Sequence, residues 1–120
     1  MRKISSSNPH LLKLIRFLRK AAKENNATIW SYVANTLAKP RNRRASINLS
    51  QINRHTEKDQ VVAVGGKVLG AGTIRHPVTV AAFEFSVTAE KKIKIAKGRC
   101  LTLPELVKEN PTGSNIKVIR

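Results

Sequence analysis

Apolar residues in the first third of the chain recur at helical spacing. Asn8 and Pro9 form a typical helix start, because asparagine caps helices and proline is favoured at the first helical position. The pattern after them predicts a helix to about residue 25, with apolar positions three and four residues apart at Leu11, Ile15, Leu18 and Ala22. A second stripe at the same spacing is entirely cationic and consists of Lys13, Arg16, Lys20 and Lys23.

A second helix is predicted over residues 28–38, with Thr28 as its cap. Trp30 and Tyr32 could stack on bases, but the helical spacing of the surrounding apolar residues favours packing of Trp30 in the core. We therefore expect residues 8–39 to form a helical hairpin with a basic outer surface.

The rest of the chain alternates between strand-like and helix-like patterns. Strands are predicted over residues 60–64, 78–86, 99–101 and 116–119. Helical segments are predicted after Asn48, from Thr88 to a stop at Gly98, and from a capping box formed by Thr102 and Glu105. This mixture predicts an α+β fold, in which residues 48–120 form a mixed strand and helix domain packed with the hairpin as one compact unit.

Four glycines within residues 65–72 indicate tight turns or a close approach of the backbone to something else. Lys67 follows Gly66 as in a nucleotide phosphate loop, but Val68 stands where that loop requires Ser or Thr, so we exclude it. Two alternatives stay open for this segment: a simple tight turn, or a close approach to RNA with Lys67 projecting.

Net charge narrows the choice of partner. The 120 residues include 23 Lys+Arg and 7 Asp+Glu, a formal net charge of +16. Residues 1–44 hold 11 of these cations and one acid, Glu24. Such an excess favours a polyanionic partner, and we prefer nucleic acid to membrane because no apolar run approaches the ~18 residues of a membrane span.

The densest charge lies in a basic linker predicted over residues 40–47, which directly follows Lys39. Its cations have no acid nearby, so they repel one another and become favourable only opposite a polyanion. Residues 1–7 are predicted to be a flexible basic tail. The linker and its neighbours contain the strongest candidate RNA contacts, namely Lys39, Arg41, Asn42, Arg43 and Arg44.

Residue patterns typical of catalysis are missing. His10, His55 and His76 stand far apart without Cys or carboxylate at metal-ligand spacing, and no two acids resemble a general acid and base pair. The sequence therefore predicts neither an enzyme nor a cofactor or metal site. The single cysteine, Cys100, excludes an internal disulfide and fits a reducing compartment, where we expect it to be a small buried side chain.

Several short motifs occur in one order along the chain, among them Lys39-Pro40-Arg41, Asn48-Leu49-Ser50, Gly66-Lys67-Val68-Leu69-Gly70 and Asn110-Pro111-x-Gly113-Ser114. Over residues 8–120 this series resembles the archaeal and eukaryotic large-subunit ribosomal protein eighteen-e family, which is similar in fold to bacterial large-subunit ribosomal protein fifteen.

The resemblance implies a cytoplasmic structural constituent of the large ribosomal subunit that binds ribosomal RNA, contacts neighbouring ribosomal proteins, and supports subunit assembly and translation. It implies no cofactor, no small-molecule substrate and no membrane. The low aromatic content, 4%, argues against serial stacking of bases and favours folded RNA held by its phosphates. The complete set of predicted RNA-binding residues is Arg2, Lys3, Lys13, Arg16, Lys20, Lys39, Arg41, Asn42, Arg43, Arg44, Asn48, Lys67, Arg75 and His76.

The two predicted helices with a short connection also permit an alternative, a helix-turn-helix or nucleoid-type DNA-binding protein. In that case only Asn35 and Lys39 of the second helix could reach base edges, because the remainder of that helix is mostly apolar.

Overall fold

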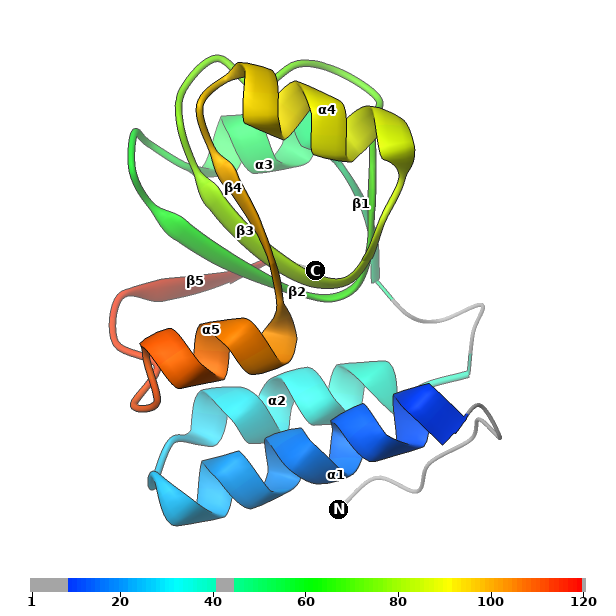
Figure 1. Ribbon diagram of the computed structural model, residues 1–120, viewed down its shortest axis with the longest axis vertical. Coiled ribbons are helices and arrows are strands. Elements are labelled where there is room, and N and C mark those ends of the chain that lie inside the picture. The colour runs from blue at the N-terminus through cyan, green and yellow to red at the C-terminus, as the bar shows by residue number, and fades with distance from the viewer. Residues whose placement is uncertain (1–8, 41–44, 120) are drawn as a thin grey trace.

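The computed structural model describes residues 9–40 and 45–119, which form helices on both sides of a sheet (Figure 1). Within these residues the helices are α1 (Pro9–Glu24), α2 (Thr28–Leu37), α3 (Leu49–His55), α4 (Val87–Ile95) and α5 (Leu103–Glu109). The strands are β1 (Ala45–Asn48), β2 (Val61–Leu69), β3 (Thr79–Phe85), β4 (Arg99–Thr102) and β5 (Ile116–Ile119). The predicted α+β fold with an N-terminal helical hairpin is confirmed.

All strand pairings among the described residues are parallel, in the order β1-β2-β3-β4. Two strands share one side of β2: β5 pairs with its first part, residues 61–64, and β1 with its last part, residues 66–69. Parallel strands are buried on both faces and are therefore apolar without alternation. This requirement explains why Val61-Val62-Ala63-Val64 is an uninterrupted apolar run.

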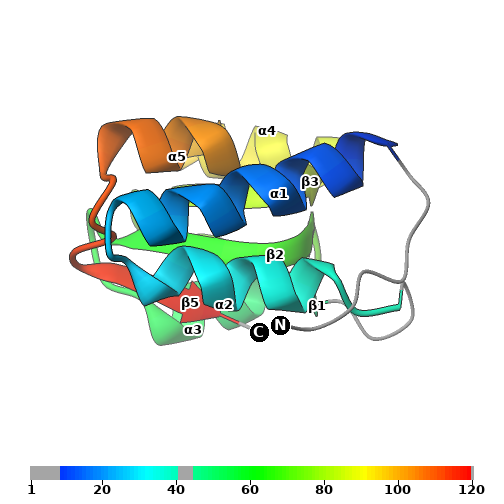
Figure 2. The same cartoon turned by 90° about the horizontal axis from the view of Figure 1, so that it is seen from below.

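Three helices cover one face of the sheet. Helix α2 packs against β2, helix α5 packs against β3, and α1 contacts both α2 and α5. Seen from that side, α1 lies between the other two helices (Figure 2). The apolar stripe of α1 that the sequence predicted is buried here, with Leu11, Ile15 and Leu18 inaccessible to solvent.

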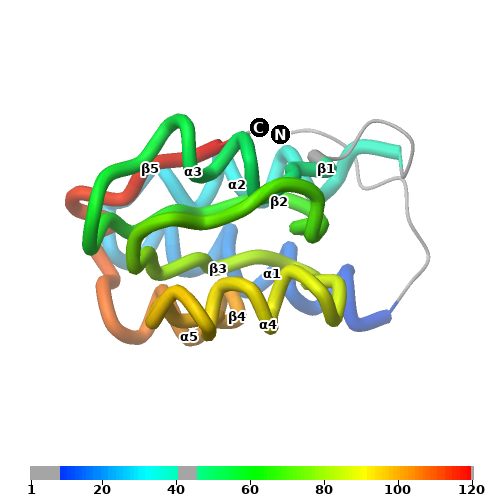
Figure 3. Tube along the Cα trace, turned by 90° about the horizontal axis from the view of Figure 1, so that it is seen from above, coloured from blue at the N-terminus to red at the C-terminus, as the bar shows by residue number. Residues whose placement is uncertain are grey.

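Helices α3 and α4 cover the opposite face. Seen from above, α3 lies on the β1 and β2 side and α4 on the β3 and β4 side (Figure 3). Ile52 of α3 and Ile93 of α4 are fully buried against the strand residues Val62, Val64 and Val80. The sheet is thus enclosed between two separate apolar cores.

The tryptophan of the hairpin ties the N-terminal helices to the end of the chain. Trp30 is fully buried, and its indole Nε1 donates a hydrogen bond of 2.8 Å to the carbonyl oxygen of Pro111. The prediction that Trp30 packs in the core is therefore confirmed, and its ring is not available to stack on bases.

Helix α2 sits directly on the backbone of β2. A Cβ added at Gly65 would lie 2.9 Å from the Cβ of Thr36, closer than real Cβ contacts, and 3.0 Å from its Cγ2. Residues 65 and 66 continue β2, with an irregularity in its pairing to β3 between Val64 and Lys67. Of the two alternatives left open for the glycine segment, a tight turn does not occur at these two glycines, where the backbone is approached closely by helix α2. An approach of this segment to RNA stays a prediction.

Three other local predictions were also wrong. Ala27, not Thr28, precedes α2 as its N-cap and gives no side-chain cap. Ser86, not Thr88, caps α4, since its hydroxyl accepts a 3.1 Å hydrogen bond from the Ala89 amide. Strand β1 begins at Ala45, inside the segment expected to be linker, because pairing with β2 outweighs its weak local pattern.

We predict that Gly65→Ala destabilises the protein by about 1–3 kcal/mol, because the new methyl group must displace Thr36 and α2 from β2. Urea unfolding followed by Trp30 fluorescence would measure the change. An unchanged midpoint would show that α2 does not sit on β2 as closely as described.

Candidate nucleic-acid interface

The cationic stripe predicted on the first helix lies on the exposed side of α1. Lys13, Arg16 and Lys23 are exposed, and no ion pair or side-chain hydrogen bond joins them to another described residue. Lys20 forms a 3.7 Å ion pair with Glu24, but both side chains are largely exposed, and such pairs contribute little stability. The stripe therefore remains available to a polyanion.

Phe17 adds an apolar side chain to this exposed surface, which we call the α1 surface and define as Lys13, Arg16, Phe17, Lys20 and Lys23. Its side chain is 43% exposed, although aromatic rings are usually more buried. The sequence analysis did not select Phe17. Its position in the sequence could have identified it as exposed, because Phe17 falls outside the apolar stripe, between Lys13 and Lys20 on the helix surface.

Two predicted contacts, Arg75 and His76, lie away from the α1 surface, beside α3. The Arg75 amide donates a 2.9 Å hydrogen bond to Oδ1 of Asn53, and His76 Nε2 lies 2.9 Å from the Thr56 hydroxyl. Helix α3 is on the opposite side of the sheet from α1 (Figure 1). The structure thus separates these two residues from the stripe with which the sequence analysis grouped them.

Three further predicted contacts lie near the ends of β1, β2 and α2. Lys67 is exposed on β2, where its register partners are Ser46 on β1 and Glu84 on β3. Asn48 precedes α3, and its amide donates a 3.0 Å hydrogen bond to the side chain of Gln51. Lys39 follows α2 and is half-buried. The other predicted contacts, Arg2, Lys3, Arg41, Asn42, Arg43 and Arg44, lie outside the described residues.

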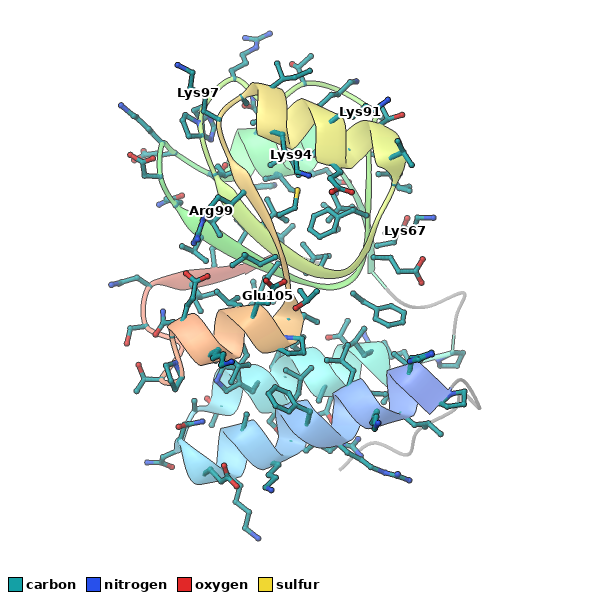
Figure 4. All side chains as sticks on the ribbon, viewed as in Figure 1. Lys67, Lys91, Lys94, Lys97, Arg99 and Glu105 are labelled. Carbon is teal, nitrogen blue, oxygen red and sulfur yellow. The ribbon has the colours of Figure 1, made fainter. Side chains whose placement is uncertain are left out.

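Other cations form hydrogen bonds or ion pairs within the protein. Lys92 Nζ donates hydrogen bonds of 2.8 and 2.9 Å to the carbonyl oxygens of Gly70 and Gly72, fixing the glycine loop to α4. Lys94 pairs with Glu90 one helical turn earlier at 2.8 Å, and Glu90 raises the pKa of Lys94. Lys91 and Lys97 of the same region project outward instead (Figure 4).

Acidic residues of the last third of the chain also have structural roles. Arg99 and Glu109 form a 2.9 Å ion pair between β4 and α5. Glu105 closes the predicted capping box at the start of α5, where its carboxylate accepts a 2.8 Å hydrogen bond from the Thr102 amide (Figure 4). This hydrogen bond from Thr102 lowers the pKa of Glu105. No ion pair joins Glu105 or Glu109 to a described lysine.

The helix-turn-helix alternative conflicts with the packing of α2. Trp30, Val33 and Leu37 of this helix are fully buried, since α2 lies against both α1 and β2. The Oδ1 atom of Asn35, one of the two residues that could read bases, is itself buried. A helix enclosed in this way cannot enter a DNA major groove, so we discard a helix-turn-helix reader.

Residues 9–40 and 45–119 contain neither a cluster of candidate metal ligands nor a helix that could span a membrane. These residues contain no group of three or more His, Cys, Asp or Glu side chains that could hold a metal ion. None of their helices is long and apolar enough to cross a bilayer.

Fold and charge together define a small basic domain. Helices enclose its parallel sheet, and cations without acid partners lie on its outer surface. The family described as ribosomal protein 60S L18 and 50S L18e matches residues 1–120. The chain belongs to this family. It is therefore a ribosomal protein and not an enzyme, and the resemblance seen in the sequence is confirmed.

Individual relatives agree with this assignment over nearly their whole length. The chain is 51% identical to large ribosomal subunit protein eL18 of Methanothermobacter thermautotrophicus over 119 residues, which cover 99% of this chain and 98% of the relative. It is 44% identical to eL18 of Halobacterium salinarum over 117 residues, covering 98% of this chain and 100% of the relative.

We predict that Lys92→Gln destabilises the fold by about 1–3 kcal/mol, because it removes two hydrogen bonds from a charged donor to the glycine loop. Lys91→Gln is the matched control on the same helix and should change the free energy of unfolding by less than about 0.5 kcal/mol. Urea denaturation of both variants measures the difference, and equal midpoints would contradict a structural role of Lys92.

We also predict that Cys100 reacts slowly with iodoacetamide in the native protein. Burial raises the pKa of its thiol from 9.0 to about 11, so far less thiolate is present near pH 8 than in the unfolded chain. The alkylation rate should rise by roughly two orders of magnitude in urea, following the pKa difference. Mass spectrometry of timed samples measures this rate, and equal rates in native buffer and in urea would refute the expected protection.

Proposed function

We propose that this protein is a structural constituent of the large ribosomal subunit in the cytoplasm, where it binds ribosomal RNA and supports subunit assembly and translation. Family membership supports the ribosomal role, and the observation that carries the mode of binding is the α1 surface. Three of its four cations, Lys13, Arg16 and Lys23, gain nothing from one another and have no described ion-pair partner. A phosphate backbone would neutralise them and release its counterions.

Contacts with phosphate suit this surface better than readout of bases. The deep major groove of A-form RNA is closed to side chains, so proteins hold such helices mainly through phosphates and 2′-hydroxyl groups. Lysine and arginine on one helical face can follow a backbone, while Phe17 can pack against sugars beside it. Phosphate contacts fix the position of the protein without reading sequence.

The proposal also includes cations that lie outside the described residues. Arg41, Arg43 and Arg44 precede β1, and Arg2 and Lys3 precede α1. Together with Lys39, Asn42, Asn48 and Lys67 they are the further RNA contacts that we propose, while neighbouring ribosomal proteins would meet surfaces that carry fewer cations. No cofactor and no small-molecule substrate belong to this function.

We predict that Lys13→Gln combined with Arg16→Gln weakens binding to large-subunit ribosomal RNA by roughly tenfold near 100 mM salt and lowers the slope of log K against log salt by roughly 1.5. The control is Lys91→Gln with Lys108→Gln, which removes the same charge from α4 and α5. Filter binding over a salt series measures both quantities. Equal losses in the two double variants would mean that net charge, and not the α1 surface, determines affinity.

The same assay addresses the remaining DNA-binding alternative. We expect folded ribosomal RNA to displace the protein from duplex DNA of equal length, because placement depends on RNA shape as well as charge. Tighter binding to the DNA duplex would overturn the proposed function.

A further inference from the structure

Helix α4 carries two large apolar side chains on its outer side. Val87 is 70% exposed and Ile95 is 80% exposed, more than Phe17 and Tyr32, the other exposed large apolar residues of the described chain. Positions 87, 91 and 95 are four residues apart, so Val87, Lys91 and Ile95 form one stripe along the helix. A short helix thus leaves in water the kind of side chain that often marks an interface.

A hollow with a largely apolar wall lies next to this stripe. It is open and lies between the loop before β3 and the last turn of α4, where Thr73, Ile74, Arg75, Lys92, Ile95 and Ala96 line it. Ile74 is half-buried and packs against the core that α3 and α4 share, while Ile95 lines the hollow from the helix. The hollow can therefore receive an apolar side chain from a partner.

Hydrogen bonds hold both ends of the loop that forms this hollow. Lys92 Nζ donates to the carbonyl oxygens of Gly70 and Gly72 at one end. At the other end the Arg75 amide donates a 2.9 Å hydrogen bond to Asn53 of α3. A surface whose shape is already fixed loses less conformational entropy on binding than a mobile one, so this hollow is suited to docking.

Lysines flank the apolar side chains. Residues 87–97 contain four lysines and one acid, Glu90, which pairs with Lys94. Lys91 and Lys97 are exposed, and no ion pair or side-chain hydrogen bond joins them to another described residue. These two lysines compare with four cations on the α1 surface, and here they stand around an apolar centre. A complementary partner must therefore supply apolar side chains in the middle and carboxylates at the edge.

A phosphate backbone would match only half of this surface. It would neutralise the lysines, but Val87 and Ile95 would gain nothing from facing a charged chain. An apolar centre with a polar rim is instead the usual composition of a protein interface. Helix α4 also lies on the opposite side of the sheet from α1, so RNA held by the α1 surface leaves it uncovered (Figure 1).

We propose that an acidic segment of a neighbouring large-subunit protein docks on this part of the molecule, which we call the α4 surface and define as Ile74, Val87, Lys91, Ile95 and Lys97. Apolar side chains of that segment would cover Val87 and Ile95 and enter the hollow beside Ile74, while its Asp or Glu residues would pair with the two lysines. We choose a permanent neighbour because the two aliphatic side chains would otherwise stay in water throughout the life of the particle. This inference rests on the proposed function and adds the position and chemistry of a protein contact.

Zero-length cross-linking of purified native large subunits tests the docking. A carbodiimide joins a lysine amine directly to a carboxylate, so only acids in contact with Lys91 or Lys97 are linked to them. We expect mass spectrometry to find one of these lysines joined to Asp or Glu of another protein, with a large apolar residue of that protein within about four positions. The link between Lys94 and Glu90, which lie 2.8 Å apart, is the internal reference for yield.

Variants show whether the apolar side chains are responsible for the docking. Tagged full-length protein with Val87→Ser and Ile95→Ser is produced in archaeal cells, and large subunits that contain it are isolated by the tag. The yield of links from Lys91 and Lys97 should fall by about fivefold or more, because truncation of central apolar residues weakens an interface most. Val87→Ile with Ile95→Val is the matched control, which keeps both lysines and the apolar area and should give the native yield.

Both substituted positions are exposed, and serine has a helix propensity close to that of valine and isoleucine, so we expect the variants to fold. Thermal unfolding of each purified variant checks this before its cross-links are counted. Ile95→Ser alone replaces the double variant if the latter is unfolded.

Three results would overturn the docking: no link from Lys91 or Lys97 to another protein in native subunits that contain the chain, attachment of RNA instead of protein to residues 87–97 after ultraviolet irradiation of the same subunits, or equal yields from the serine and exchange variants. A failure of the proposed function is seen earlier, as absence of the chain from purified large subunits, and that result would overturn both proposals.

Discussion

A parallel sheet with two apolar faces is the constraint on which the rest of this structure depends. Alternate residues of β2 point to opposite cores, Ala63 toward α1, α2 and α5, and Val62 and Val64 toward α3 and α4. Because each face must be covered, the chain sends helices to both sides. Most of both faces of the sheet is then covered, so a binding surface must be built from the outer sides of helices, from loops and from the few exposed strand positions such as Lys67.

The few acidic residues reinforce this arrangement. All seven lie in the described residues, and four of them have described partners within the protein: Glu24 and Glu90 pair within their helices, Glu105 caps α5, and Glu109 pairs with Arg99 of β4. Only three acids remain against a large excess of cations. Most of the acidic side chains therefore interact within the protein, whereas most of the lysines and arginines have no acid beside them. This arrangement is favourable only next to a polyanion.

Most helices and strands could be predicted because their signals are local. Pro9 and the apolar stripe behind it define α1, and the pair Thr102 and Glu105 defines the start of α5. The strand through Gly65 could not be predicted, because glycine is unfavourable in strands unless another element approaches closely, and that element, α2, lies far away in the sequence. Strand β1 was missed for the same reason, since its partner β2 supplies the stability that its own residues lack.

The grouping of cations on one surface could be predicted only where a single element carries it. The stripe on α1 follows from helical periodicity alone, so Lys13 and Arg16 were identified from their spacing. The meeting of Arg54, Arg75 and Lys117 at the C-terminal end of α3 depends on strand register. Parallel strands begin at one edge of a sheet, so the residues just before β2 and β3 meet those of β5. Arg75 was selected as part of a basic turn, but Arg54 and Lys117 were not, because nothing in their own neighbourhoods shows that the three share an edge. The same parallel pairing that forces helices onto both faces therefore also assembles, away from α1, a group of cations that the linear sequence keeps apart.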